Sequence, residues 1–238
     1  MNKVKDRIKY TLSYFPALQA LAKKVYFYLF TSRAEFESSE NYWKERYQKG
    51  GNSGEGSYNK FAIFKSDVIN DFVSRNSISS AVEHGCGDGN QLGLLRIPSY
   101  TGIDISHEAI QICKEKYKND QSKSFFTLAE YSGQPAEMAI SLDVIYHLVE
   151  ESTYHGYLNA LFNSSTRYVV IYSSNTDTQD KYQGKHVHHR KFTDWVERQK
   201  PEWALIEVKK NIYPYNGDDT KGSFADFYFF EKTEKSAG

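Results

Sequence analysis

The sequence is short of cysteine and has no excess charge of either sign. Its 238 residues include only two cysteines, Cys86 and Cys113, and 30 basic residues balance 30 acidic ones. Two cysteines do not build a disulfide framework, so we expect a protein of a reducing cytoplasm. A chain without net charge has no global attraction to nucleic acid, and we therefore expect no nucleic-acid partner.

Long apolar runs are absent as well. No stretch reaches the roughly 20 apolar residues that a membrane-spanning helix needs, and the start lacks the apolar core of a signal peptide, so we expect neither. Residues 1–38 instead mix basic with aromatic and aliphatic side chains. This pattern predicts a helical arm, packed on the domain or on a second subunit, or alternatively a peripheral membrane-surface helix.

The rest of the chain alternates short apolar runs with amphipathic stretches. We expect one domain over residues 39–233, followed by a frayed tail at 234–238. The alternation predicts an α/β fold that is Rossmann-like and doubly wound, with a mostly parallel seven-stranded sheet and an antiparallel last strand. The expected strands cover 78–83, 100–105, 124–128, 139–144, 167–172, 203–209 and 225–231, and the expected helices cover 40–49, 58–75, 91–95, 107–117, 152–162 and 192–199.

A glycine-rich loop follows the first expected strand. It reads Glu83-His84-Gly85-Cys86-Gly87-Asp88-Gly89. Alternate glycines allow a tight turn and a close approach of the backbone to a ligand. The spacing differs from the G-x-G-x-x-G of dinucleotide-binding loops, and an acidic residue, Glu83, stands two positions before the first glycine.

Two further segments carry chemistry at the expected strand ends. Asp104 ends the second expected strand, where a carboxylate can accept hydrogen bonds from ribose hydroxyls, although an Asp before a helix is also a common cap. The fourth expected strand ends in Ser141-Leu142-Asp143-Val144-Ile145-Tyr146-His147. The carboxyl ends of parallel strands meet at one edge, so these segments are expected to form one site.

Together these segments resemble the class I S-adenosylmethionine (SAM)-dependent methyltransferases. The resemblance implies SAM as cofactor and S-adenosylhomocysteine as product. It also implies that Glu83 positions the methionine part, that the glycine loop lies against the cofactor and that Asp104 binds the ribose. The cofactor residues that it implies are Tyr47, Glu83, Gly85, Cys86, Gly87, Asp104, Ile105, Glu130, Leu142, Asp143 and His147.

Over residues 40–231 the chain is also similar to uncharacterised bacterial methyltransferases that are often linked to surface-glycan or secondary-metabolite pathways. This resemblance implies transfer to a small polar acceptor, most readily an oxygen of a sugar, nucleotide-sugar or glycan-linked group. The segment between Phe125 and Ala139 is shorter than in similar chains, and this affects the wall expected beside the adenine.

Methyl transfer needs an aligned nucleophile and, for a hydroxyl, a base. The candidate bases or substrate clamps are His147, His186 and His189, and the candidate substrate residues are Ser174, Asn175 and Arg190. The same residues have plainer interpretations as loop caps, turn residues or a solvated basic surface. No cysteine or carboxylate set accompanies the histidines, so we expect no metal.

Other functions remain open at this point. The same fold also serves as a catalytically silent SAM-binding module in a complex, and the acceptor atom is alternatively a nitrogen of a small metabolite. A nicotinamide oxidoreductase is disfavoured by the glycine spacing. A nucleic-acid methyltransferase is disfavoured because there is neither a target motif of the Asn-Pro-Pro-Tyr type nor a broad basic excess.

Overall fold

The computed structural model describes residues 36–179, 184–218 and 220–233. The expected arm and frayed tail therefore lie almost wholly outside the described residues. The secondary-structure elements are α3 (Ser39–Gln48), η2 (Glu55–Ser57), α4 (Asn59–Arg75), β1 (Ser80–His84), η3 (Gln91–Leu94), β2 (Ser99–Asp104), α5 (His107–Lys116), β3 (Lys123–Thr127), β4 (Ala136–Leu142), η4 (Ile145–His147), α6 (Glu151–Asn163), β5 (Ser165–Ser173), α7 (Phe192–Gln199), β6 (Trp203–Lys209) and β7 (Asp226–Lys232).

The strands form one seven-stranded sheet in the order β3-β2-β1-β4-β5-β7-β6. Strands β1 to β5 pair in parallel, whereas β7 is antiparallel to both β5 and β6. The expected fold class is confirmed, including the antiparallel last strand. The described residues between β6 and β7, 210–218 and 220–225, contain no helix, and β7 pairs with β6 in the opposite direction without a crossover.

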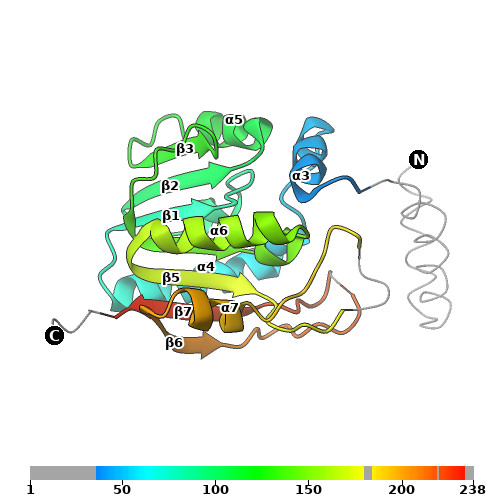
Figure 1. The fold of residues 1–238 in the computed structure, drawn as a ribbon. Coiled ribbons are helices and arrows are strands. Elements are labelled where there is room, and N and C mark those ends of the chain that lie inside the picture. The colour runs from blue at the N-terminus through cyan, green and yellow to red at the C-terminus, as the bar shows by residue number, and fades with distance from the viewer. Residues whose placement is uncertain (1–35, 180–183, 219, 234–238) are drawn as a thin grey trace.

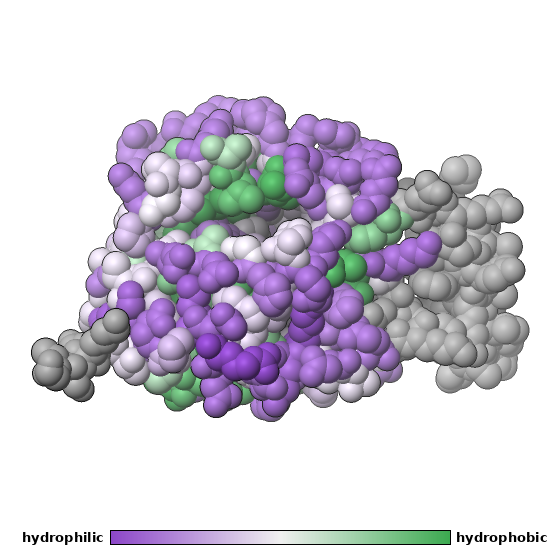
Figure 2. Space-filling view, in the orientation of Figure 1, coloured by the Kyte–Doolittle hydropathy of each residue, from purple (hydrophilic) through white to green (hydrophobic). Residues whose placement is uncertain are grey.

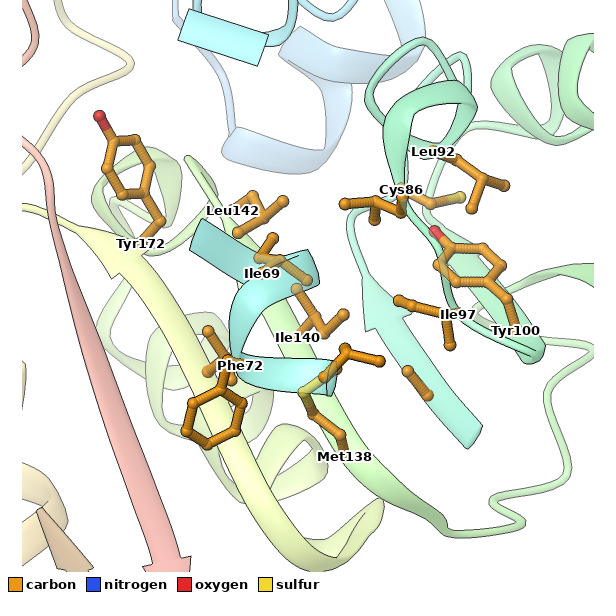
Figure 3. Packing of buried hydrophobic residues seen from close by; sticks show 14 of the residues in the cluster. Ile69, Phe72, Cys86, Leu92, Ile97, Tyr100, Met138, Ile140, Leu142 and Tyr172 are labelled. Carbon is orange, nitrogen blue, oxygen red and sulfur yellow. The ribbon is translucent and has the colours of Figure 1, made fainter. Parts of the chain in front are cut away.

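Helices cover both faces of the sheet (Figure 1). On one face, α4 and α5 pack their apolar side chains on the strands, and Figure 3 shows Ile69 and Phe72 of α4 beside Met138 and Ile140 of β4. On the other face, α6 and α7 bury a second cluster that includes Leu158 and Phe192. The sheet is thus enclosed as a parallel sheet requires, and its carboxyl edge is left for a ligand.

Apart from two elements, the expected bounds agree with the structure to within two residues at either end, and those two differ in type or by more. The helix expected over 91–95 is a single 3-10 turn, η3, because the glycine loop precedes it and Pro98 follows closely. Strand β4 begins at Ala136, before its expected start, because its first residues pair with Ser165 at the rim.

The connection from β3 to β4 contains no helix, and all of its residues, 128–135, are described. Gly133 and Pro135 stand in this segment, and both disfavour a helix. The sheet face beside β3 is consequently less covered than the face under α6. Figure 2 shows apolar surface in a hollow between this edge and α6.

Candidate cofactor and acceptor site

The glycine loop begins where β1 ends. Gly85, Gly87 and Gly89 all have positive φ angles, of 81°, 57° and 67°, and L side chains rarely adopt this conformation. Space is equally restrictive. A Cβ at Gly85 would lie 2.4 Å from a methyl carbon of Val144, and a Cβ at Gly87 would lie 2.3 Å from the Ser53 hydroxyl. The loop therefore has glycine where no side chain fits.

Asp104 joins the second strand to this loop. Its Oδ2 accepts a hydrogen bond from the Gly87 amide at 2.9 Å, and its Oδ1 accepts one from the Ser106 amide at 2.9 Å. Burial raises the pKa of Asp104, and these backbone hydrogen bonds oppose the rise. Each carboxylate oxygen has a further lone pair, so Asp104 supports the loop and can still accept from a ribose hydroxyl.

Glu83, the next-to-last residue of β1, carries a buried carboxylate and is only 3% exposed. The Tyr100 hydroxyl donates a hydrogen bond to its Oε2. Burial raises the pKa of Glu83 to about 7, although the Tyr100 hydrogen bond and the charge of Lys65 both lower it. A carboxylate that titrates near neutrality beside a ligand loop is typical of a functional site.

The segment after α3 closes over the glycine loop. The Ser53 amide donates to Asp88 Oδ2 at 3.1 Å, and the Asp88 amide donates to Ser53 Oγ at 3.0 Å. Tyr58 donates to Asp88 Oδ2 at 2.6 Å, and the Tyr47 and Ser53 hydroxyls are 2.8 Å apart. Burial raises the pKa of Asp88, but these hydrogen bonds overcome it and leave the pKa below its usual value.

The end of β4 has an unusual backbone. Asp143 has φ +59°, which is uncommon for a residue other than glycine and is most often seen for Asn, Asp and His. Its carboxylate contacts the buried Lys65 ammonium at 2.6 Å and accepts from the Tyr146 hydroxyl at 2.8 Å. Leu142, the preceding residue, is buried in the core. The strand end is therefore fixed by charge as well as by sheet pairing.

The remaining predicted cofactor residues occupy different environments. Cys86 is buried, and contact with the Cys113 thiol together with burial holds its pKa well above the usual value, so the thiol is an inert packing group. Ile105 is half-buried beside Asp104. Glu130 is exposed and accepts from the Thr127 amide at 2.9 Å and the Thr127 hydroxyl at 3.0 Å. Glu130 thus closes the turn after β3.

His147 and His186 lie together beside α3. Their rings are stacked with centroids 5.3 Å apart, and His147 Nδ1 lies 3.0 Å from the His186 carbonyl oxygen. Trp43 packs edge-on against His147, and Tyr42 stacks on His186 with centroids 4.3 Å apart. Burial lowers the pKa of His147 to about 4, and burial followed by the Arg46 charge lowers that of His186. Both rings are neutral at pH 7.

The predicted substrate residues follow β5. His189 Nδ1 lies 2.7 Å from Ser174 Oγ, so the structure brings this pair together. Asn175 instead bonds Thr193 at the start of α7. Arg190 bonds Glu151 and the carbonyl oxygens of Leu148 and Val149 at 2.7 to 2.9 Å. The geometry gives Asn175 and Arg190 structural partners, and their substrate roles stay predictions.

Sequence reasoning missed several residues of this site: Ser53, Tyr58, Lys65, Asp88 and Tyr100. Most of them act through partners that are distant in sequence, such as Lys65 with Asp143. Lys65 carried one signal, because a charge at a position facing the sheet breaks the apolar stripe of α4. Among the described residues, no group of three His, Cys, Asp or Glu side chains is placed to hold a metal ion.

This arrangement fits SAM. The glycine loop turns where side chains have no room, so its backbone lies directly at the strand ends, and the buried Glu83 carboxylate before it suits a cation. Asp104 adds acceptors at the neighbouring strand end. Open α/β sheets bind ligands at this edge.

Comparison with known proteins agrees with this fit. Residues 82–156 match the methyltransferase domain family. A 74-residue segment is 35% identical to the tRNA (carboxymethyluridine(34)-5-O)-methyltransferase of Arabidopsis thaliana; it makes up 31% of this chain and spans only 18% of that relative.

Solved structures share the fold. The N-methyltransferase NodS from Bradyrhizobium japonicum WM9, in complex with S-adenosyl-L-homocysteine, superposes with a TM-score of 0.64 at 14% identity, covering 83% of this chain and 100% of NodS. The small RNA methyltransferase HEN1 superposes with a TM-score of 0.54 at 15% identity, covering 75% of this chain and 26% of HEN1.

Residues 82–156 thus match a methyltransferase domain, and the described residues share the fold of solved methyltransferases, one of them bound to S-adenosyl-L-homocysteine. These findings support SAM as the cofactor.

The expectation that nucleic acid is excluded as a partner is wrong. A tRNA methyltransferase is similar in sequence and an RNA methyltransferase is similar in fold. The expectation rested on net charge, which averages over the whole surface and does not describe the local charges at a binding face.

Proposed function

We propose that the chain transfers the methyl group of SAM to an oxygen atom of a polar acceptor. One observation carries this proposal: a glycine loop at the end of β1 lies between buried carboxylates on β1 and β2 and under a closing segment. SAM supplies a methyl group that is already activated as a sulfonium. The protein has to hold the cofactor, align the acceptor and exclude water.

Within this proposal, Glu83 faces the positively charged methionine part of the cofactor, and Asp104 accepts hydrogen bonds from the ribose. Gly85 and Gly87 let the backbone approach the ligand. The segment Gly50–Ser57 covers the cofactor and shields it from water, which strengthens the electrostatic interactions beneath it.

His147 is the proposed base for a hydroxyl acceptor. A carbonyl oxygen only accepts hydrogen bonds, so the contact with the His186 carbonyl assigns the proton to Nδ1 and leaves the Nε2 lone pair of a neutral ring. A pKa of about 4 makes His147 a weak base. It therefore suits a proton that leaves as the new O–C bond forms, rather than one removed beforehand.

A small sugar, nucleotide-sugar or glycan-linked group is the acceptor that we propose first, by analogy with the bacterial chains that this sequence resembles. The His189–Ser174 pair after β5 and the aromatic rings of Tyr42 and Trp43 line the same edge of the sheet and offer polar and stacking contacts. Residues 1–35 would add a contact to a second subunit or a membrane surface in the cytoplasm.

RNA is the second candidate acceptor. A 74-residue segment is 35% identical to the Arabidopsis protein, and that protein is by name an O-methyltransferase of tRNA. This similarity supports RNA as an acceptor.

The test is a labelling experiment. The protein would be incubated with SAM carrying a labelled methyl group and, separately, with free sugars, nucleotide-sugars, isolated surface glycan, total tRNA and small amines. The Gly87→Val variant serves as the control that lacks cofactor binding. We expect label in one oxygen-bearing class only. Label in amines alone would overturn oxygen transfer, and SAM binding without label in any pool would indicate a silent binding module.

A further inference from the structure

Lys65 is fully buried, with 0% of the residue exposed, on the face of α4 that packs against the sheet. Lysine is almost never buried to this extent unless it is paired. Its ammonium group lies 2.6 Å from Asp143 Oδ2 and 5.4 Å from the centre of the Tyr172 ring. This places one cation below the carboxyl ends of the central strands.

Asp143, just after β4, contacts this cation, and two further carboxylates stand on the neighbouring strands β1 and β2. Glu83 is the next-to-last residue of β1, and the Lys65 charge lowers its pKa, whereas the charge of Asp104, at the end of β2, raises it. The charged and titratable groups around this cluster include Asp143, Glu83, Asp104, Asp88, His147, Cys86, Tyr47, Tyr100, Tyr146, Tyr157 and Tyr172.

Asp143 also connects the cluster to the closing segment. A Cβ at Gly56 would lie 2.8 Å from Asp143 Oδ2, so the backbone of the segment passes directly over this carboxylate. The Lys65–Asp143 pair therefore lies between α4, the end of β4 and the cover of the cofactor site. If Lys65 served only to pack α4 on the sheet, its partner Asp143 would not need to lie beneath the closing segment.

The positive charge of SAM indicates what the Lys65–Asp143 pair does in this site. SAM carries a sulfonium and an ammonium against one carboxylate, so it binds as a cation. The like charges of Glu83, Asp104 and Asp143 repel one another in a buried site, and without a nearby cation the most buried of them takes up a proton. A neutral Glu83 would no longer attract SAM.

We propose that Lys65 is a positioning residue for SAM: its buried ammonium group anchors Asp143 between the end of β4 and the closing segment, and its charge stabilises the buried carboxylates that receive the cofactor. This inference rests on the proposed placement of SAM at Glu83. It concerns binding, so it is tested without knowledge of the acceptor.

The test is the pH dependence of SAM affinity in Lys65→Met, measured by calorimetric titration from pH 6 to pH 9. Removing the cation raises the pKa of Glu83, so the midpoint below which SAM affinity falls should move upward. A move of about one pH unit corresponds to roughly tenfold weaker binding near pH 7. Raising the pH to 9 should restore the affinity.

Lys60→Met is the matched control, since Lys60 lies on the same helix but bonds the exposed Lys221 carbonyl. It should leave the profile unchanged. If Lys65→Met fails to fold, Lys65→Met/Asp143→Asn removes both charges, and Asn tolerates the left-handed backbone of residue 143. Because the double variant also loses the repulsion from the Asp143 charge, it should show a smaller upward shift than loss of the cation alone, and an absent or downward shift would contradict the role of Lys65.

Two outcomes would overturn the inference. One is an unchanged SAM affinity and midpoint in the Lys65 variants. The other is an affinity that is reduced equally at every pH, because this describes a purely structural lysine. Glu83→Gln distinguishes a wrong placement of SAM from a wrong role for Lys65. Normal SAM binding by Glu83→Gln would refute the placement of the cofactor itself, whereas its loss of binding beside a normal Lys65→Met profile would refute the role of Lys65 alone.

Discussion

Glu83 is buried, so ionising its carboxyl group destabilises the fold, and stability measurements at different pH values can detect this effect. Its pKa is about 7 in the folded chain against an ordinary value of 4.5. A carboxyl group with a raised folded-state pKa stabilises the fold fully below its unfolded pKa, and this contribution is lost as the pH rises through the folded pKa. The window for Glu83 is therefore pH 4.5 to 7.

We predict that Glu83→Gln removes this dependence. Relative to the wild type, the variant should gain about 2–3 kcal/mol of unfolding free energy between pH 4.5 and pH 8. Urea denaturation at several pH values measures this difference, and Glu197→Gln, at an exposed residue of α7, is the control. A constant difference between variant and wild type would show that Glu83 does not titrate in this range.

Asp104 gives the second prediction at this scale. Asp104→Asn retains one side-chain acceptor for the Gly87 and Ser106 amides, whereas Asp104→Ala removes both. We expect the alanine variant to weaken SAM binding by roughly 1–3 kcal/mol, with a smaller loss for the asparagine variant. Equal and normal affinities in a calorimetric titration would remove Asp104 from the ribose site.

The resemblance to the methyltransferases, together with the glycine spacing, predicted Glu83, Gly85, Gly87 and Asp104 as cofactor residues. The structure places these residues at two neighbouring strand ends, and their roles toward SAM stay predictions. Lys65 was not predicted, since its partner Asp143 lies 78 positions away. Pairings of that kind depend on which strands become neighbours, and no local pattern specifies this.

At the scale of elements, the closing segment depends on hydrogen bonds to one carboxylate. Tyr58, before α4, and Ser53 both bond Asp88. We predict that Tyr58→Phe loosens the segment Gly50–Ser57, because it removes a charge-assisted hydrogen bond worth about 1.5–3 kcal/mol.

Amide hydrogen exchange at Ser53 measures this loosening, and the expected change is about tenfold faster exchange or more. Lys49→Ala is the control, since it removes an exposed ion pair with Glu45 at the end of α3, just before this segment. Unchanged exchange in Tyr58→Phe would mean that packing, and not Asp88, holds the segment closed.

The order of elements was predictable because apolar runs and amphipathic stretches alternate clearly. The bounds of the elements were less predictable. Strand β4, for example, begins earlier than expected because Ala136 pairs with Ser165 of the neighbouring strand. The short connection after β3 was visible as a short segment in the sequence. The 3-10 turn η3 was not, because leucines at helical spacing fit a helix and a single turn equally well.

At the scale of the whole molecule, formal neutrality combines with strong local charge. The 30 basic and 30 acidic residues cancel in the sum, while the cofactor site holds the buried carboxylates of Glu83 and Asp104 and the ion pair of Lys65 with Asp143. Whole-chain charge therefore describes neither the preference of the cofactor site for a cation nor the partners of the outer surface. No helix in the described ranges is long and apolar enough to cross a membrane.

The central claim is that the glycine loop of this fold holds SAM. Calorimetric titration of the wild type and of Gly87→Val with SAM, and of the wild type with NAD, tests it most directly. A Cβ at Gly87 would meet the Ser53 and Tyr47 hydroxyls, at a positive φ that valine avoids. The account predicts that SAM binds the wild type with one molecule per chain, that NAD does not bind, and that a folded Gly87→Val binds no SAM. Absence of SAM binding to the wild type, or equal binding by both proteins, would contradict it.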